Sequence, residues 1–342
     1  GIHELMSSGT TCILDMATVR HTNAIFKAVQ SSGIRANVGK CLMDHPEHAP
    51  HELRETTHEA LSEAVSLFDK WHGHSDDRIR VSFAPRFALS CTEELLRKVA
   101  SLSKEKQALI HTHASENQKE IEWVKKLTGL RNIEYFEKLG LLSSRLVLAH
   151  CVWLDENEKQ LLVKNNTSIT HCPSSNLKLA SGIAELPDLM RRKLNVSLGS
   201  DGAPCNNSMN MFQEMRLAAL VHKPSSGPKA LCAQDALDMA TLNGAKALHW
   251  NDDIGSIEIG KKADLSLIDL HHPENYVSPD TLKRCDGDKI VSSIVYSCNP
   301  KHVKLTMIDG RVVYDGKETT TISRVKLMQK LKVAQKKFSR AF

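Results

Sequence analysis

The segment HTHASE, from His111 to Glu116, holds the densest group of chemically useful side chains in the sequence. If this segment is a β-strand, His111 and His113 point to the same side, and Glu116 lies in the following loop. Two further polar residues, His150 and Asp201, each come after a short apolar run. Imidazole and carboxylate groups bind zinc and iron, so His113, His150 and Asp201 could converge on one divalent cation. Glu116 could then carry the proton of a metal-bound water, although spacing alone leaves a structural role for these residues open.

Seven short β-rich runs alternate with segments of helical length, and these elements must position the polar side chains. Strands separated by helices pair in parallel through right-handed crossovers, with both faces of each strand buried. The pattern predicts an α/β fold, a (β/α)8 barrel of the TIM type, with functional residues at the carboxyl ends of the strands. The expected strands are 10–16, 36–42, 80–83, 108–113, 146–149, 168–170 and 196–198. The polar residues at their ends are Asp15, Lys40, Arg86, His113 with Glu116, His150, His171 and Asp201.

Helix starts are also visible in the sequence. Segments 92–102, 117–127 and 155–163 open with Thr, Asn or Asp and carry acids in the first turn. An apolar helix over residues 2–8 is expected to end at Gly9. A closed barrel of this kind has eight strands, whereas the sequence supplies seven. We therefore expect the first strand to lie upstream of Gly1, and the alternative is a seven-stranded barrel.

The sequence after Trp250 has a different pattern. Segments 255–269 and 304–318 alternate apolar and polar residues with the period of strands, and the second turns on Asp309-Gly310. Residues 1–250 are thus expected to form the barrel, and residues 251–321 a small β module of a composite β-sandwich whose other strands lie upstream. The tail, residues 322–342, is predicted as a basic amphipathic helix that packs on the barrel or, alternatively, faces a partner or an acidic surface. Its apolar side would hold Val325, Met328, Leu331 and Phe338.

The composition of the 342-residue chain narrows the classes of function. No apolar stretch approaches the ~20 residues that a membrane helix needs. Nine cysteines without a Cys-x-x-Cys pair indicate reduced thiols, so we expect a cytoplasmic protein. The net charge is +5, but the last 20 residues hold seven Lys or Arg and no acid, which leaves −2 on the remaining 322 residues. The body of the protein therefore lacks the basic surface of a nucleic-acid-binding protein.

Five segments resemble the amidohydrolase superfamily, and the resemblance covers nearly the whole chain in the correct order. The branch in question is that of the metal-dependent aminohydrolases, which includes guanine deaminase, methylthioadenosine/adenosylhomocysteine deaminase and the triazine hydrolases. The segments are PRFALSC (85–91), HTHASEN (111–117), LAHCVWL (148–154), HCPSSNLKLASG (171–182) and LGSDGAP (198–204). The resemblance implies a hydrolase of carbon–nitrogen bonds in cyclic amidines, with one zinc, or alternatively iron, per chain. It also implies a cytoplasmic homodimer that acts on a small heterocyclic substrate.

The resemblance implies a role for each strand-end residue. His113 and Asp201 would bind the metal, and Asp201 would also receive a proton. Glu116 would carry the proton, and His150 would orient the attacking water or the substrate ring. The family takes two more ligands from a His-x-His motif at the end of the first strand, and no such motif precedes Thr10. We expect that an N-terminal segment is missing, since this one event would explain the missing motif, the missing strand and the partial β module; it would also put the metal affinity and activity of residues 1–342 in question.

Different segments of the sequence resemble enzymes that act on different substrates. Residues 35–44, 53–61 and the PRF of residues 85–87 are similar to guanine deaminases. In those enzymes this Arg and Phe contact the purine, which implies substrate-binding roles for Arg86 and Phe87, with His150 beside them. Segment 203–223 is instead similar to the adenosine and triazine enzymes. The leading hypothesis is hydrolytic deamination of guanine to xanthine and ammonia. The alternatives are the same chemistry on a triazine, a pterin or methylthioadenosine/adenosylhomocysteine, and an inactive truncated barrel.

Overall fold

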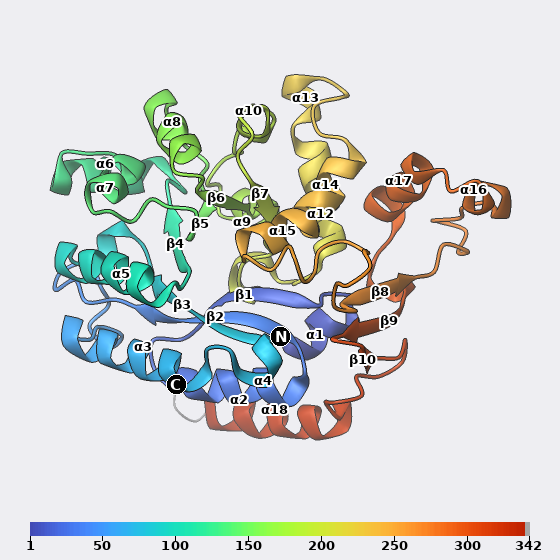
Figure 1. Ribbon diagram of the computed structural model, residues 1–342, viewed down its shortest axis with the longest axis horizontal. Helices are drawn as coiled ribbons and strands as arrows, with labels where there is room; N and C mark the ends of the chain where they lie inside the picture. Colours follow the sequence, from blue (N-terminus) through green and yellow to red (C-terminus); the bar gives the residue numbers. More distant parts are fainter. Residues whose placement is uncertain (339–342) are drawn as a thin grey trace.

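A curled, seven-stranded parallel sheet forms the centre of the protein (Figure 1). The computed structural model describes residues 1–338, and the strands run in the order β1-β2-β3-β4-β5-β6-β7, each paired with the next along the chain. The α/β barrel fold and all seven predicted strands are therefore confirmed. Within the described residues, β1 and β7 are the two edges of the sheet. The strands are β1 (Cys12–Met16), β2 (Arg35–Leu42), β3 (Ile79–Pro85), β4 (Ile110–Ala114), β5 (Leu146–His150), β6 (Ser168–His171) and β7 (Val196–Leu198).

Helices cover the outer face of the sheet, and several begin where the sequence predicts (Figure 1). The side chains of Thr92, Asn117 and Asp155 each accept a hydrogen bond from a backbone N–H in the first turn of the following helix. The helices are α1 (Ile2–Ser7), α2 (Thr22–Ser32), α3 (Thr57–Trp71), α4 (His74–Asp77), α5 (Glu93–Lys106), α6 (Gln118–Thr128), α7 (Asn132–Lys138), α8 (Glu156–Lys164), α9 (Pro173–Lys178), α10 (Leu186–Arg191), α11 (Ala203–Asn206), α12 (Met211–Val221), α13 (Lys223–Ser226), α14 (Ala233–Ala240) and α15 (Leu242–Ala247). Two short 3-10 turns are η1 (Ala88–Ser90) and η2 (Pro300–His302).

The core lies between the sheet and these helices. All eight residues of β2 are buried, as are all five residues of β5. Aliphatic and aromatic side chains from the strands, such as Phe83 and Leu148, pack in one continuous cluster with residues of α5, α7 and α12. Burial of both faces holds the strands in a fixed register, so their carboxyl ends form one rim.

A second, antiparallel sheet follows the barrel, with strands in the order β10-β9-β8. Asp309 and Gly310 connect β9 (Val303–Ile308) to β10 (Arg311–Tyr314), and both have positive φ, as a two-residue type I′ hairpin requires. The predicted hairpin is therefore confirmed. Thr306 of β9 donates to the carbonyl of Met6 on α1 at 2.8 Å, which ties this sheet to the start of the chain. The division into units at residue 250 stays a prediction.

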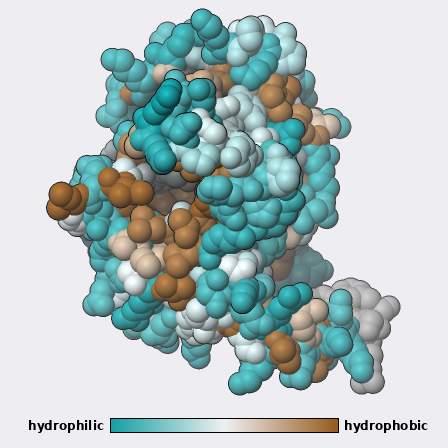
Figure 2. Space-filling view, turned by 90° about the vertical axis from the view of Figure 1, so that its right-hand side faces the viewer, coloured by the Kyte–Doolittle hydropathy of each residue, from teal (hydrophilic) through white to brown (hydrophobic). Residues whose placement is uncertain are grey.

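Two features of this region differ from the sequence prediction. Only β8 (Leu265–Ile268) forms from segment 255–269, and Ile257 and Ile259 are almost fully exposed. No strand of the described residues pairs with this part, so its period-two pattern has no sheet to join. The predicted β module also contains two helices, α16 (Pro279–Lys283) and α17 (Gly287–Ser297). Figure 2, in which the right-hand side of Figure 1 faces the viewer, shows hydrophobic residues gathered on this face of the molecule.

The tail forms the predicted helix, α18 (Arg324–Phe338). Its apolar residues Val325, Met328 and Leu331 are between 48% and 66% exposed, so the expected packing of this side on the barrel is not found. A helix that is only weakly amphipathic and rich in lysine gains little from burial, which leaves it in solvent. The side chain of Phe338 lies outside the described part of the structure. No helix within residues 1–338 has both the length and the apolar character to cross a membrane.

Candidate active site

Three of the predicted site residues meet at the rim formed by the carboxyl ends of the strands. His113 lies on β4, His150 ends β5 and Asp201 follows β7. The rings of His113 and His150 stack with centroids 5.4 Å apart, and that of His111 lies 6.3 Å from that of His113 on the same side of the strand. Asp201 is close enough to both His113 and His150 for its carboxylate to interact electrostatically with their rings. The structure therefore brings together the residues that the sequence pattern singled out.

A hydrogen bond determines which nitrogen of the His113 ring is available to bind a metal. The Nδ1–H of His113 donates to the backbone carbonyl of Arg86 at 2.7 Å, because a carbonyl can only accept. The Nε2 of His113 is left with a lone pair that faces the rim. Burial, followed by repulsion from His150, lowers the pKa of His113 to about 4, so the ring is neutral at physiological pH. A neutral imidazole with one nitrogen held by a carbonyl is the usual form of a metal-binding histidine.

Asp201 is held as a charged carboxylate. Ser175 donates its hydroxyl to Oδ2 and the Gly202 N–H donates to Oδ1, both at 2.6 Å. Burial raises the pKa of Asp201, but these two hydrogen bonds and the neighbouring histidines outweigh burial and lower it below the usual value. Asp201 therefore offers an ionised oxygen ligand on the same rim as the lone pair of His113.

Glu116 lies beside His150 in the loop after β4. Its Oε2 is 3.8 Å from the Nε2 of His150, and its Oε1 accepts a hydrogen bond from the hydroxyl of Ser181 at 2.9 Å. The Glu116 side chain is 20% exposed, so it can reach both the rim and solvent. Asn176 accepts the Nδ1–H of His150 through its side-chain oxygen at 2.8 Å, which turns the Nε2 of His150 toward Glu116. This arrangement suits a carboxylate that moves a proton.

Arg86 and Phe87 directly follow β3 on the same rim. The guanidinium of Arg86 lies over the ring of Phe87, 5.2 Å from its centroid, and the Arg86 side chain is exposed. The backbone carbonyl of Arg86 accepts the hydrogen bond from His113, and the Arg86 guanidinium lies close enough to interact with that ring electrostatically. Their roles in substrate binding stay predictions, as do the catalytic and metal-binding roles of Glu116, His150, His113 and Asp201.

Two predicted strand-end residues have other contacts. Lys40 is buried and pairs with Glu55 and Glu63 at 2.8 and 2.9 Å, so its charge is used for structure. His171 packs against His222, at the end of α12, with ring centroids 6.1 Å apart. Lys40 does not join the cluster of His113, His150, Glu116 and Asp201, whereas His171 lies close enough to His150 for the two rings to interact electrostatically. Asp15 is largely buried, and burial raises the pKa of its carboxyl.

Three residues that hold the side chains of the site in place were not predicted from the sequence. Ser175, Asn176 and Ser181 contact Asp201, His150 and Glu116 respectively. All three belong to the segment HCPSSNLKLASG, which was noted for its resemblance to a family and not for its chemistry. The only available signal was the density of small hydrogen-bonding residues in a loop after a predicted strand.

The side chains at the rim are of the chemical types that bind zinc, but few of them are placed to serve as ligands. The Nε2 lone pair of His113 and the carboxylate of Asp201 are the two groups suited to bind it, whereas zinc sites use three or more protein ligands. His3, on α1, instead contacts the hydroxyl of Thr319 at 2.9 Å. A polypeptide limited to residues 1–342 therefore offers an incomplete coordination shell.

Elsewhere in residues 1–338, His272, Glu274 and His302 form one group with ligand atoms within 4.8 Å of one another. The Nδ1 of His302 accepts a hydrogen bond from the N–H of Asn299 at 3.1 Å, which places the ring proton on Nε2. That Nε2–H then donates to Glu274 at 3.3 Å, and Lys301 pairs with the same carboxylate oxygen. The group is thus organised by its own hydrogen bonds, with no free lone pair on the His302 Nε2.

Comparison with known proteins decides the family, because residues 1–313 match the profile of the Amidohydrolase family. The chain belongs to this family. It is 38% identical over 337 residues to the 5'-deoxyadenosine deaminase of Methanobrevibacter smithii, covering 98% of this chain and 73% of that protein. The fold resembles that of an adenosine deaminase from Xanthomonas campestris with bound zinc, with a TM-score of 0.89, 29% identity and coverage of 98% and 73% of the two chains. It also resembles the E. coli guanine deaminase, with a TM-score of 0.80, 31% identity and coverage of 91% and 72%.

The resemblance to the amidohydrolase superfamily is thus confirmed. The expectation of guanine as the substrate is not supported over its alternative, since the relative with 38% identity deaminates a nucleoside of the adenosine type. The similarity to guanine deaminases is not confined to residues 35–44, 53–61 and 85–87, because the E. coli enzyme is 31% identical and covers 91% of this chain. These segments therefore do not distinguish guanine from a nucleoside of the adenosine type.

Proposed function

We propose that this protein hydrolytically deaminates the adenine ring of a nucleoside of the 5'-deoxyadenosine type, with methylthioadenosine and adenosylhomocysteine as members of the same substrate class. One observation carries the proposal: the lone pair of His113, the carboxylate of Asp201 and the proton-accepting Glu116 lie on one rim with their orientations fixed. The similarity to the 5'-deoxyadenosine deaminase supports the choice of substrate class.

The Nε2 of His113 and the carboxylate of Asp201 would hold a zinc ion. When bound, zinc supplies a Lewis acid that lowers the pKa of a bound water toward ~7. Glu116 then accepts the proton of the attacking water at Oε2 and delivers it to the departing amine nitrogen. General acid–base help of this kind contributes roughly 100- to 10,000-fold to a rate.

The role of His150 in this reaction is to orient the attacking water or Glu116. Because Asn176 accepts its Nδ1–H, the Nε2 of His150 presents a lone pair toward Glu116, 3.8 Å from the Oε2. This lone pair can accept a hydrogen bond from the attacking water or from the protonated form of Glu116. Asp201, ionised by its hydrogen bonds from Ser175 and Gly202, can receive a second proton as the amine leaves.

The proposal is tested by turnover assays on the natural polypeptide that contains this sequence, supplied with zinc. The substrates are 5'-deoxyadenosine, methylthioadenosine, adenosylhomocysteine, adenosine and guanine, with ammonia release as the readout. We expect the highest kcat/KM for one of the first three. Higher kcat/KM for guanine than for all the adenine nucleosides would refute the proposed substrate class.

Guanine remains the second candidate because of Arg86 and Phe87. A guanidinium can donate two parallel hydrogen bonds to the O6 and N7 acceptors of guanine, whereas adenine offers a donor in place of O6. The Arg86 side chain is exposed at the rim and stacks on Phe87, so it is available for such a contact.

A further inference from the structure

One loop contacts both His150 and Glu116, the two groups between which the proposed reaction moves its proton. The loop begins in α9 at Asn176, whose side-chain oxygen holds His150. Ser181 donates its backbone N–H to the carbonyl of Asn176 at 2.8 Å and its hydroxyl to Oε1 of Glu116 at 2.9 Å. Both loop residues are nearly inaccessible to solvent, Asn176 at 1% and Ser181 at 5% exposure. The same loop therefore holds both His150 and Glu116 and determines the distance between them.

Trp153 fixes this loop from the side of β5. Its indole Nε1–H donates to the carbonyl of Ser181 at 2.6 Å, although the ring is 39% exposed. A side chain on Gly182 would meet the ring of Trp153 at 2.9 Å, and Gly182 has a φ of +124°, so glycine is required for this close approach. The loop and the indole are thus in direct contact over two successive residues.

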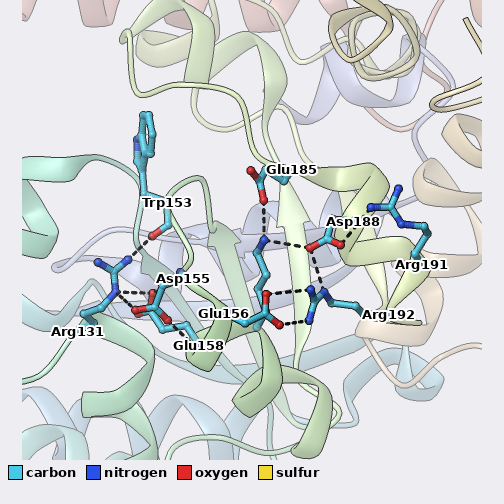
Figure 3. A network of polar contacts seen from close by, with 10 residues as sticks. Arg131, Trp153, Asp155, Glu156, Glu158, Glu185, Asp188, Arg191 and Arg192 are labelled. Atoms are coloured by element: carbon cyan, nitrogen blue, oxygen red, sulfur yellow. Dashed lines mark hydrogen bonds and ion pairs between the residues drawn. The ribbon is translucent and has the colours of Figure 1, made fainter. Parts of the chain in front are cut away.

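The backbone of Trp153 is anchored in turn at two points. Its N–H donates to the carbonyl of Ser115, the residue before Glu116, at 3.0 Å. Its carbonyl accepts a hydrogen bond from Arg131 at 2.7 Å, and Arg131 pairs with the fully buried carboxylate of Glu158 at 2.8 Å. Figure 3 shows this ion network at the start of α8, with the indole of Trp153 pointing away from it.

From these contacts we propose that Ser181 is a positioning residue for Glu116 and that the indole N–H of Trp153 holds Ser181 in place. The inference rests on the proposed role of Glu116 as proton carrier. The Ser181 hydroxyl keeps one carboxylate oxygen occupied, so the other, Oε2, is the one that faces His150 and moves the proton.

Two substitutions test the proposal in the natural zinc-containing protein. Ser181→Ala removes the hydroxyl, and we expect kcat to fall about 10- to 100-fold, since a small misplacement of a catalytic group costs up to roughly that factor. KM should change less than about twofold, since substrate binding keeps its contacts. Trp153→Phe removes the indole N–H together with part of the ring, and it should lower kcat in the same direction, with less than additive effect in the double variant.

Matched controls separate positioning from structure. Ser103→Ala deletes another buried serine hydroxyl, which donates to the carbonyl of Ala108 at 2.7 Å away from the rim, and Trp123→Phe changes another exposed indole. Both should leave kcat and KM unchanged. The positioning role is refuted if Ser181→Ala retains kcat within twofold. Retained activity in Glu116→Gln would instead refute the proposed function, so the two failures are distinguishable.

Discussion

Replacement of Glu116 by Gln isolates the proton-carrying role of this side chain. The amide is nearly the same size, and its oxygen can still accept the Ser181 hydroxyl that now lies 2.9 Å from Oε1. The amide nitrogen cannot accept a proton, so the step assigned to Oε2 is lost. Loss of general acid–base help of roughly 100- to 10,000-fold corresponds to about 2.7 to 5.4 kcal/mol in the barrier.

The assay measures kcat with 5'-deoxyadenosine and the zinc content of the same preparation. Zinc should stay near the wild-type level, because His113 and Asp201 are the proposed ligands and Glu116 has the separate proposed role of proton carrier. Glu122→Gln, an exposed carboxylate on α6, is the matched control and should leave kcat unchanged. If Glu116→Gln keeps more than a tenth of the wild-type kcat, Glu116 is not the proton carrier and the reasoning fails.

Four further outcomes follow from the contacts described above. Asp264→Asn should lower the free energy of unfolding, measured in urea, by about 3 kcal/mol or more, because it removes the carboxylate 2.7 Å from the fully buried Arg35 and leaves the more distant Asp309, at 3.9 Å, as its counter-charge; an effect under about 1 kcal/mol would contradict this. Arg86→His should reduce any turnover of guanine at least tenfold and spare 5'-deoxyadenosine, and equal losses on both substrates would assign Arg86 a structural role. Stability should fall as the pH drops below ~6.5, because the buried His171 and His222, with pKa values of about 3 and about 4, stay neutral in the native state while the unfolded chain takes up protons; His222→Gln should flatten this dependence in urea titrations between pH 7 and 5. A polypeptide limited to residues 1–342 should retain well under one equivalent of zinc in equilibrium dialysis against a weak chelator, since two protein ligands are too few, and full retention would reveal a ligand not identified above.

The barrel strands and the starts of several helices could be predicted because their signals are local. A run such as RLVLAH is apolar on both faces, and Asp155 and Asn117 satisfy backbone N–H groups within their own helices, so neither needs the rest of the fold to be recognised. The Asp309-Gly310 hairpin belongs to the same class, since two residues with positive φ determine the turn. The strand pattern at 255–264 failed for the opposite reason, because a strand exists only when another strand pairs with it.

The sequence by itself determined which side chains stand at the strand ends, because a parallel barrel places every carboxyl end on one rim. It could not determine their orientation. The free nitrogen of His113 depends on the carbonyl of Arg86, and the direction of Glu116 depends on Ser181, 65 residues further along the chain. The segment that supplies Ser181 resembles the family, but nothing in its sequence indicates that Ser181 reaches Glu116. Only the packing of β4, β5 and the loop after β6 brings these donors and acceptors within 3 Å, where hydrogen bonds select one arrangement.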